Sequence, residues 1–160
     1  MAEVLIVDDD PDIRMMLRFA LEDAGFEVRT ASDGVEALAA LRERTPDCMV
    51  LDLMMPNLDG FGLLRVMRET GLESATRTVI LTCKVDEADV VTGLELGAHE
   101  YLSKPFEPDR LGGILQRLLD STTEALADRR RVQLDKAAFR DRIESALARS
   151  RRRAGSVPSA

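Results

Sequence analysis

The sequence predicts an α/β fold in which a parallel sheet is covered by helices on both faces. Short apolar runs alternate with amphipathic stretches of about a dozen residues, and five such strand–helix pairs follow one another along the chain. A helix that connects two parallel strands crosses one face of the sheet, so both faces become buried. The 160 residues suffice for one such domain and an extension, at roughly 100 to 200 residues per domain.

The first two strand–helix pairs are predicted before residue 45. The apolar run 3–7 predicts a strand, and 10–24 predicts a helix, with an aspartate and a proline at its start and a glycine after its end. Alternating residues at 26–31 predict the second strand. Ser32 and Asp33 begin the next helix, and we expect four of its apolar residues on one face. These are Val35, Ala37, Leu38 and Leu41.

The other three pairs follow the same pattern. Each predicted strand is short and apolar, and turn residues separate it from the next amphipathic stretch. The predicted strands are 48–51, 78–81 and 100–102, and the predicted helices are 60–70, 86–96 and a last one that begins at Pro108. A doubly wound sheet brings the carboxyl ends of the first and third strands together.

The charge of the chain is unevenly distributed. Residues 1–120 hold 12 Lys and Arg against 24 Asp and Glu, a net charge of -12, whereas residues 121–160 hold 10 against 5, a net charge of +5. The acidic part disfavours nucleic-acid binding by itself, and the basic part can meet an anionic partner. We find no signal peptide and no apolar run near the roughly 20 residues that span a bilayer, so we expect a cytoplasmic protein. The sole histidine, His99, is expected at the surface.

The residues after 120 predict a helical extension. The stretch 123–148 contains neither Gly nor Pro and is rich in Ala, Leu and Arg, so we expect helix over 121–150 and a basic, disordered tail over 151–160. Four apolar residues at helical spacing predict a narrow stripe that packs on the α/β domain, on a second copy or on a partner. They are Val132, Phe139, Ile143 and Leu147.

Polar residues end the strands and are expected to gather at one edge of the sheet. Asp8 and Asp9 follow the first strand, and Asp52 follows the third. Thr82 ends the fourth strand, and Lys104 comes after the fifth. Crowding of carboxylates is costly unless a cation or protons relieve it, and Mg²⁺ fits best because it prefers oxygen ligands. A cation, an ammonium and a hydroxyl beside an acceptor carboxylate suit phosphoryl transfer, because its transition state spreads negative charge over three oxygens.

These residues resemble the receiver domain of two-component response regulators, over roughly residues 3–119. Four motifs carry the resemblance, and they are specific in combination rather than singly. The motifs are Leu5-Ile6-Val7-Asp8-Asp9-Asp10, Leu51-Asp52-Leu53-Met54-Met55-Pro56 with Gly60, Ile80-Leu81-Thr82, and Gly97-Ala98 leading to Tyr101-Leu102-Ser103-Lys104-Pro105-Phe106. The resemblance implies a flavodoxin-like, doubly wound sheet with strand order 2-1-3-4-5, and a receiver domain over residues 1–120.

The resemblance also implies a role for each residue of the acidic cluster. Asp52 would be the phosphoacceptor, and a carboxylate is a known nucleophile for phosphoryl groups. Asp9 and Asp52 would bind Mg²⁺ together with the backbone carbonyl of Met54, and Asp8 would act through a bound water.

The remaining implied roles concern the phosphate and the signal. Lys104 would pair with Asp52 or its phosphate, and the Thr82 hydroxyl would bind a phosphate oxygen. Tyr101 matches an aromatic switch that reshapes the face formed by the fourth helix, fifth strand and fifth helix. The bond between Lys104 and Pro105 is expected to be cis, which costs proline little.

Three residues near the site are expected to modulate it. Cys83 replaces the usual small residue after Thr82, which would tighten the mouth of the site. Met54 lies two residues after Asp52, and Lys84 lies two residues after Thr82. Both are expected to flank the path of an attacking water. The lifetime of the phosphate is therefore left open.

We therefore expect a response regulator receiver, a phosphoprotein that is phosphorylated on Asp52 by a sensor histidine kinase, a phosphotransfer protein or a small phosphodonor. It would not be an enzyme with a separate substrate, although it could catalyse its own phosphorylation and dephosphorylation. The sequence has no recognisable effector domain, so output is expected through a downstream protein or a homodimer.

Three alternatives remain open at this point. A DNA-binding transcriptional regulator would place the basic C-terminal helix on the phosphate backbone, and its DNA affinity would depend steeply on salt. The chain could also be the receiver portion of a larger regulator whose output domain is absent. A Mg²⁺-dependent phosphohydrolase would need a second carboxylate two residues after Asp52, where Met54 stands.

Overall fold

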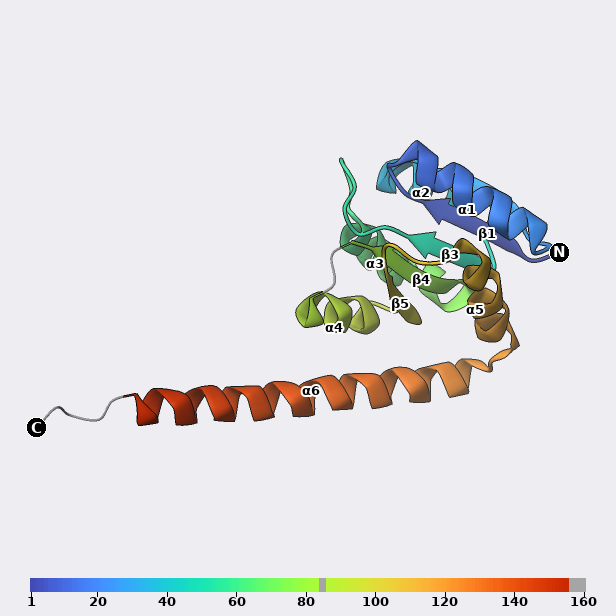
Figure 1. Ribbon diagram of the computed structural model, residues 1–160. Coiled ribbons are helices and arrows are strands. Elements are labelled where there is room, and N and C mark those ends of the chain that lie inside the picture. Colours follow the sequence, from blue (N-terminus) through green and yellow to red (C-terminus); the bar gives the residue numbers. More distant parts are fainter. Residues whose placement is uncertain (84–85, 156–160) are drawn as a thin grey trace, which may run out of the picture.

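The computed structural model describes residues 1–83 and 86–155. Its centre is a parallel sheet of five strands in the order β2-β1-β3-β4-β5 (Figure 1). The strands are β1 (Glu3–Val7), β2 (Glu27–Ala31), β3 (Cys48–Leu51), β4 (Arg77–Thr82) and β5 (Glu100–Ser103). This confirms the predicted fold class and strand order.

The helices connect these strands in the predicted order. They are α1 (Pro11–Asp23), α2 (Gly34–Glu43), α3 (Gly60–Glu69), α4 (Glu87–Glu95), α5 (Pro108–Asp120) and α6 (Thr123–Ala154), and a short 3₁₀ helix covers Leu72–Ala75. The side chain of Asp10 caps α1 by accepting hydrogen bonds from the backbone N–H groups of Asp12 and Ile13. Because capping residues of this kind can be recognised in a sequence, they allow the start of a helix to be predicted.

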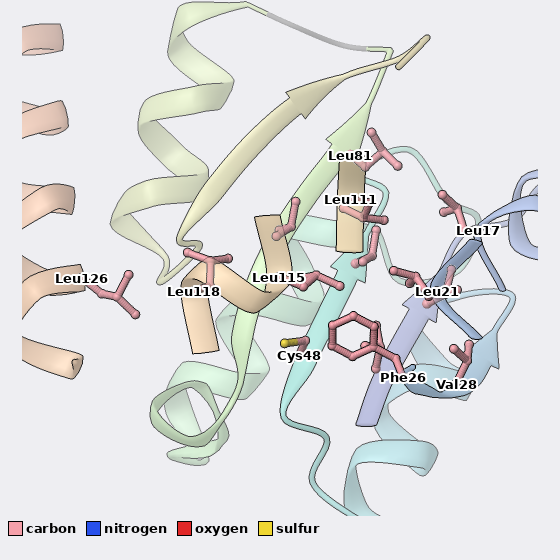
Figure 2. Packing of buried hydrophobic residues seen from close by; sticks show 14 residues of the cluster. Leu17, Leu21, Phe26, Val28, Cys48, Leu81, Leu111, Leu115, Leu118 and Leu126 are labelled. Carbon is pink, nitrogen blue, oxygen red and sulfur yellow. The ribbon is translucent and has the colours of Figure 1, made fainter. Parts of the chain in front are cut away.

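Successive residues of each central strand point to opposite faces of the sheet, which divides the core into two layers. Val4 and Ile6 pack with α1 and α5, and Figure 2 shows this layer from close by. Leu5 and Val7 pack into the other layer, which residues of α2 and α3 complete. The sheet is therefore buried on both faces, and its carboxyl edge is left for polar chemistry.

Val35 contradicts the predicted apolar face of α2, because its side chain is 58% exposed. Ala37 and Leu41 are buried as expected. A helix turns by about 100° per residue, so Val35 points about 160° away from Ala37 and about 120° away from Leu41. The residue lies in the first turn of the helix and faces solvent.

The C-terminal helix α6 is separate from α5 and longer than predicted. Ser121 and Thr122 have extended backbones, and the Thr122 side chain caps α6 by accepting from the N–H of Ala125. The helix continues to Ala154, four residues past the predicted boundary. Three arginines in the last turn stabilise the negative end of the helix dipole, and this favours the extra turn. Residues 156–160 of the predicted tail lie outside the described residues.

The apolar stripe on α6 does not pack on the α/β domain. The side chains of its four residues are between 44% and 59% exposed. These are Val132, Phe139, Ile143 and Leu147. Contact of this stripe with a second copy or with a partner stays a prediction.

His99 is half-buried, so its expected place at the surface is wrong. Its Nδ1 accepts a hydrogen bond from the backbone N–H of Thr78 at 3.0 Å, which requires a neutral imidazole. Burial, together with the positive charges of Arg130 and Arg77, lowers the pKa of His99 from 6.5 to about 4. The ring therefore helps to hold β4 beside the residues that precede β5.

We expect the stability of the protein to fall as the pH drops from 6.5 towards 4. In this range the unfolded chain protonates His99 and the folded chain does not, so stability that is present above pH 6.5 is lost. One pKa unit corresponds to about 1.4 kcal/mol, so the contribution of His99 is at most about 3 kcal/mol. Urea unfolding of the wild type and of His99→Asn across this range measures it. Parallel pH profiles for the two proteins would count against this assignment.

Candidate functional site

The register of the sheet brings two aspartates together at its carboxyl edge. Val7 of β1 pairs with Leu51 of β3, so the next residues, Asp8 and Asp52, leave the sheet side by side. The backbone N–H of Asp52 donates to the carbonyl of Val7 at 2.9 Å, which ties the two strand ends to each other. The predicted convergence of these residues is therefore present.

Three carboxylates form an oxygen-rich cluster. One oxygen from each of Asp8, Asp9 and Asp52 lies within 4.8 Å of the other two. Asp8 is 2% exposed and Asp52 6% exposed, whereas Asp9 faces solvent. A cavity of about 410 Å³ opens beside Asp9 and Met54. Hard oxygen donors with one open side fit Mg²⁺, which keeps some of its waters when it binds to protein.

Lys104 bridges the two buried carboxylates. Its Nζ lies 2.7 Å from Asp8 Oδ2 and 3.2 Å from Asp52 Oδ2. Burial by itself would lower the pKa of Lys104, but the hydrogen bond to Asp8 and the negative charges of Asp52 and Asp8 outweigh it, and the pKa is raised. The resemblance implied the Asp52 contact and not the shorter one to Asp8, because sequence order gives no distance between residues 96 positions apart.

Three neighbours hold Asp8 in place through hydrogen bonds, namely Asp10, Arg14 and Lys104. Burial raises the pKa of Asp8 and outweighs the hydrogen bonds from Lys104 and from the backbone N–H of Asp10, which act to lower it. The Arg14 side chain donates to the backbone carbonyl of Asp8 at 2.7 Å and anchors the turn between β1 and α1. Arg14 was not identified from the sequence, where it is one of many arginines on helix surfaces.

Thr82 ends β4, and Tyr101 lies on β5, the strand that precedes Lys104. Thr82 is fully buried at the end of β4, and its carbonyl accepts from the backbone N–H of Lys104 at 2.9 Å. Tyr101 is half-buried and lines a cavity between α4, β5 and α6. Burial, and then the charges of Asp89, Asp86 and Asp52, raise the pKa of Tyr101 to about 12. The switch roles of Thr82 and Tyr101 stay predictions.

The structure describes two of the three expected modulators, Met54 and Cys83. The backbone N–H of Met54 donates to Asp52 Oδ1 at 3.2 Å, and its side chain is 60% exposed beside the acidic cluster. Cys83 is exposed. Lys84 lies outside the described residues. The peptide bond between Lys104 and Pro105 is cis, as expected.

Comparison with known proteins agrees with the geometry of this site. The family model of the response regulator receiver domain matches residues 4–116. The chain is 45% identical over 108 residues to the DNA-binding response regulator MtrA of Mycolicibacterium smegmatis, covering 68% of this chain and 46% of that protein. It is 44% identical over 123 residues to the probable transcriptional regulator ycf27 of Guillardia theta, covering 77% and 47%. The chain thus spans about half the length of these relatives.

Solved structures give the same result. The chemotaxis response regulator CheY4 of Vibrio cholerae superposes with a TM-score of 0.69 at 39% identity, covering 74% of this chain and 98% of that one. The receiver domain of Francisella response regulator 1452 gives 0.70 at 34% identity, covering 74% and 97%. In the described part of the chain, each helix is too short or too polar to cross a membrane. The chain belongs to the response regulator receiver family of two-component signalling.

Proposed function

We propose that the protein is a phosphorylation-dependent signalling receiver, and that Asp52 accepts the phosphoryl group in a Mg²⁺-dependent reaction. The observation that carries this proposal is the pairing of a buried Asp52 carboxylate with the Lys104 ammonium, 3.2 Å away, inside a cluster of three aspartates. A surface aspartate at a turn would need neither the burial nor the paired cation.

The reaction makes one bond and breaks one. An oxygen of Asp52 attacks phosphorus, and the bond from phosphorus to the imidazole nitrogen of a phosphohistidine, or to the oxygen of a small phosphodonor, breaks. Asp9, Asp52 and the carbonyl of Met54 would hold Mg²⁺, with Asp8 acting through water, and the ion supplies charge neutralisation for the transferring oxygens. Lys104 is close enough to Asp52 to stabilise the phosphate, and the buried Thr82 hydroxyl is expected to bind another of its oxygens.

Asp52 would keep its phosphate as a signal rather than act as a turnover nucleophile. A hydrolase needs an acid/base carboxylate near the acceptor, and Met54 occupies the position two residues on. The kinase or phosphotransfer protein would supply the phosphate in the cytoplasm. Output would pass to a downstream protein or through a homodimer.

DNA binding is the second candidate, because relatives such as MtrA are named DNA-binding response regulators. The basic residues after 120 could contact phosphates, but three arginines of α6 already contact the α/β domain. They are Arg129, Arg130 and Arg140. Those charges are unavailable to DNA while α6 lies on the domain, and residues 1–120 carry a net charge of -12, so protein contacts are the favoured output. A steep loss of DNA affinity with salt would support the second candidate.

The test is the intact mass of the protein after incubation with acetyl phosphate and Mg²⁺. We expect the wild type to gain one phosphate, and a chelator or Asp52→Asn to abolish the gain. Asp12→Asn removes an exposed carboxylate from the first turn of α1 and should behave as the wild type. Equal phosphate uptake by Asp52→Asn, or none by the wild type, would contradict the proposal.

A further inference from the structure

The helix α6 covers the face of the domain that α4 and β5 form. It runs past the β5 edge of the sheet and alongside α4 (Figure 1). Between the three elements lies a cavity of about 490 Å³. Its lining includes Val91 and Leu94 of α4, Tyr101 of β5, and Gln133 and Ala137 of α6. The face expected to carry the signal is thus already occupied by a segment of the same chain.

Contacts at the start of α6 fix it to the domain. Leu126 is 5% exposed and belongs to the core layer that contains Leu118 (Figure 2). The guanidinium of Arg130 donates to the carbonyls of Gly97 at 2.9 Å and Ala98 at 3.2 Å. These carbonyls follow α4, so α6 begins its path at the turn between α4 and β5.

Two ion pairs then attach α6 to the two elements separately. Arg129 lies 2.6 Å from Glu100, the first residue of β5. Arg140, three turns further along α6, lies 3.0 Å from Glu87, the first residue of α4. A single helix therefore bridges β5 and α4 through two ion pairs.

Other features of the same contact oppose docking. The side-chain oxygen of Gln133 is buried without a hydrogen-bond partner among the described residues. On the other side of the contact, a cavity of about 700 Å³ is lined by acidic side chains from both helices. They are Glu87 and Glu95 of α4, and Asp135, Asp141 and Glu144 of α6. The acidic side chains of α4 and α6 repel one another across this cavity. This repulsion opposes the docked position of α6 and favours its release.

The two anchored elements lead directly to the acidic cluster. Strand β5 begins at Glu100, which forms the ion pair with Arg129, and ends at Ser103. The next residue is Lys104, which forms ion pairs with Asp8 and Asp52. The chain from Thr82, at the end of β4, reaches Glu87 within five residues. A phosphate that repositions Lys104 or Thr82 acts on the same elements that carry the two ion pairs.

We propose that α6 is an intramolecular occupant of the α4–β5 face, and that phosphorylation of Asp52 releases it. The coupling rests on the proposed function, whereas the docking does not. A displacement of β5 relative to α4 breaks one of the two ion pairs, because α6 cannot follow both elements. Release exposes the α4–β5 face to a partner, which has to displace α6 in order to bind.

Reciprocity gives the proposal a second consequence. If phosphate weakens docking by some factor, docking must weaken phosphorylation at equilibrium by the same factor. A chain whose α6 is undocked should therefore hold more phosphate at a limiting concentration of donor. Couplings of this kind are typically fivefold or more.

The experiment measures the distance between spin labels in the full chain. Ser150→Cys on α6 and Arg65→Cys on α3 are both exposed labelling sites. The background is Cys83→Ser, and Cys48 stays in place because burial raises its pKa to about 12 and keeps it unreactive. Arg129→Glu with Arg140→Glu is the undocking variant. The matched control is Arg131→Glu with Arg142→Glu, since Arg131 pairs only with Asp128 of α6 itself among the described residues.

We expect a narrow distance distribution in the unphosphorylated wild type and in the control, and a broad one in the undocking variant. Acetyl phosphate with Mg²⁺ should broaden the wild-type distribution, and the undocking variant should hold about fivefold more phosphate at limiting donor. A broad distribution in the unphosphorylated wild type would overturn the docking. A wild-type distribution that stays narrow after Asp52 is phosphorylated would overturn the release. Absence of phosphate from every variant would contradict the proposed function, and the docking would still be read from the unphosphorylated chain.

Discussion

Replacing Lys104 by Met is expected to lower the free energy of unfolding by about 3 kcal/mol at neutral pH without Mg²⁺. The side chain of Lys104 is 14% exposed, and those of Asp8 and Asp52 are 3% and 8% exposed. The variant would leave two neighbouring carboxylates buried without their cation. Such an uncompensated charge costs far more than the loss of an exposed ion pair.

Added Mg²⁺ should restore stability to Lys104→Met more than it stabilises the wild type. The ion binds the folded state and relieves the same repulsion that Lys104 relieves. Urea unfolding with Mg²⁺ and with a chelator measures both effects. Lys136→Met is the control, because Lys136 is exposed on α6. A Lys104→Met protein as stable as this control without Mg²⁺ would show that the ammonium does not hold the site together.

Gly60→Ala is expected to destabilise the protein by about 1 to 3 kcal/mol and to slow phosphorylation of Asp52 on the order of tenfold or more. Gly60 is the first residue of α3, and a Cβ there would lie 2.6 Å from the backbone oxygen of Asp52 and 2.8 Å from the Cα of Leu53. Both are backbone atoms and cannot rotate aside. The acceptor residue itself would have to shift.

Gly113→Ala is the matched control for this substitution. Gly113 lies within α5, and a Cβ there meets no atom within 4 Å. Alanine is the better helix former by about 1 kcal/mol, so this variant should be slightly more stable than the wild type. Thermal unfolding and the initial rate of phosphate uptake from acetyl phosphate compare the two. Unchanged kinetics in Gly60→Ala would mean that α3 does not determine the position of Asp52.

Much of the fold could be predicted because local signals and topology agree. Asp10 and Pro11 mark the start of α1, and short apolar runs such as that of β1 mark the strands. Right-handed crossovers then leave few arrangements of five parallel strands. The prediction for Val35 was wrong because an apolar residue in the first turn of α2 was taken as part of the buried face.

The sequence predicted which residues form the acidic cluster, but it did not predict which of their side chains contact each other. Strand ends place Asp8, Asp52 and Lys104 at one edge of the sheet, whatever the side chains do. The pairing of Lys104 with Asp8 depends on side-chain distances that no periodicity encodes. The burial of His99 was missed for the same reason.

The position of α6 was the least predictable feature. Its apolar residues suggested a face that packs on the domain, on a second copy or on a partner, and Phe139 and Ile143 are exposed rather than packed on the domain. Arginines make the contact instead, through the ion pairs of Arg129 and Arg140. Charged residues on a helix are usually solvated, so a sequence pattern does not separate these two arginines from Arg131 or Arg142 on the same helix.

The most direct test of the phosphoacceptor assignment is chemical trapping of the phosphorylated residue. Borohydride reduces an aspartyl phosphate to homoserine, and peptide mass spectrometry then locates the reduced residue. After treatment with acetyl phosphate and Mg²⁺, we expect homoserine at position 52 and at no other aspartate. Homoserine at Asp8 or Asp9, or phosphate uptake that leaves residue 52 as aspartate, would contradict the assignment.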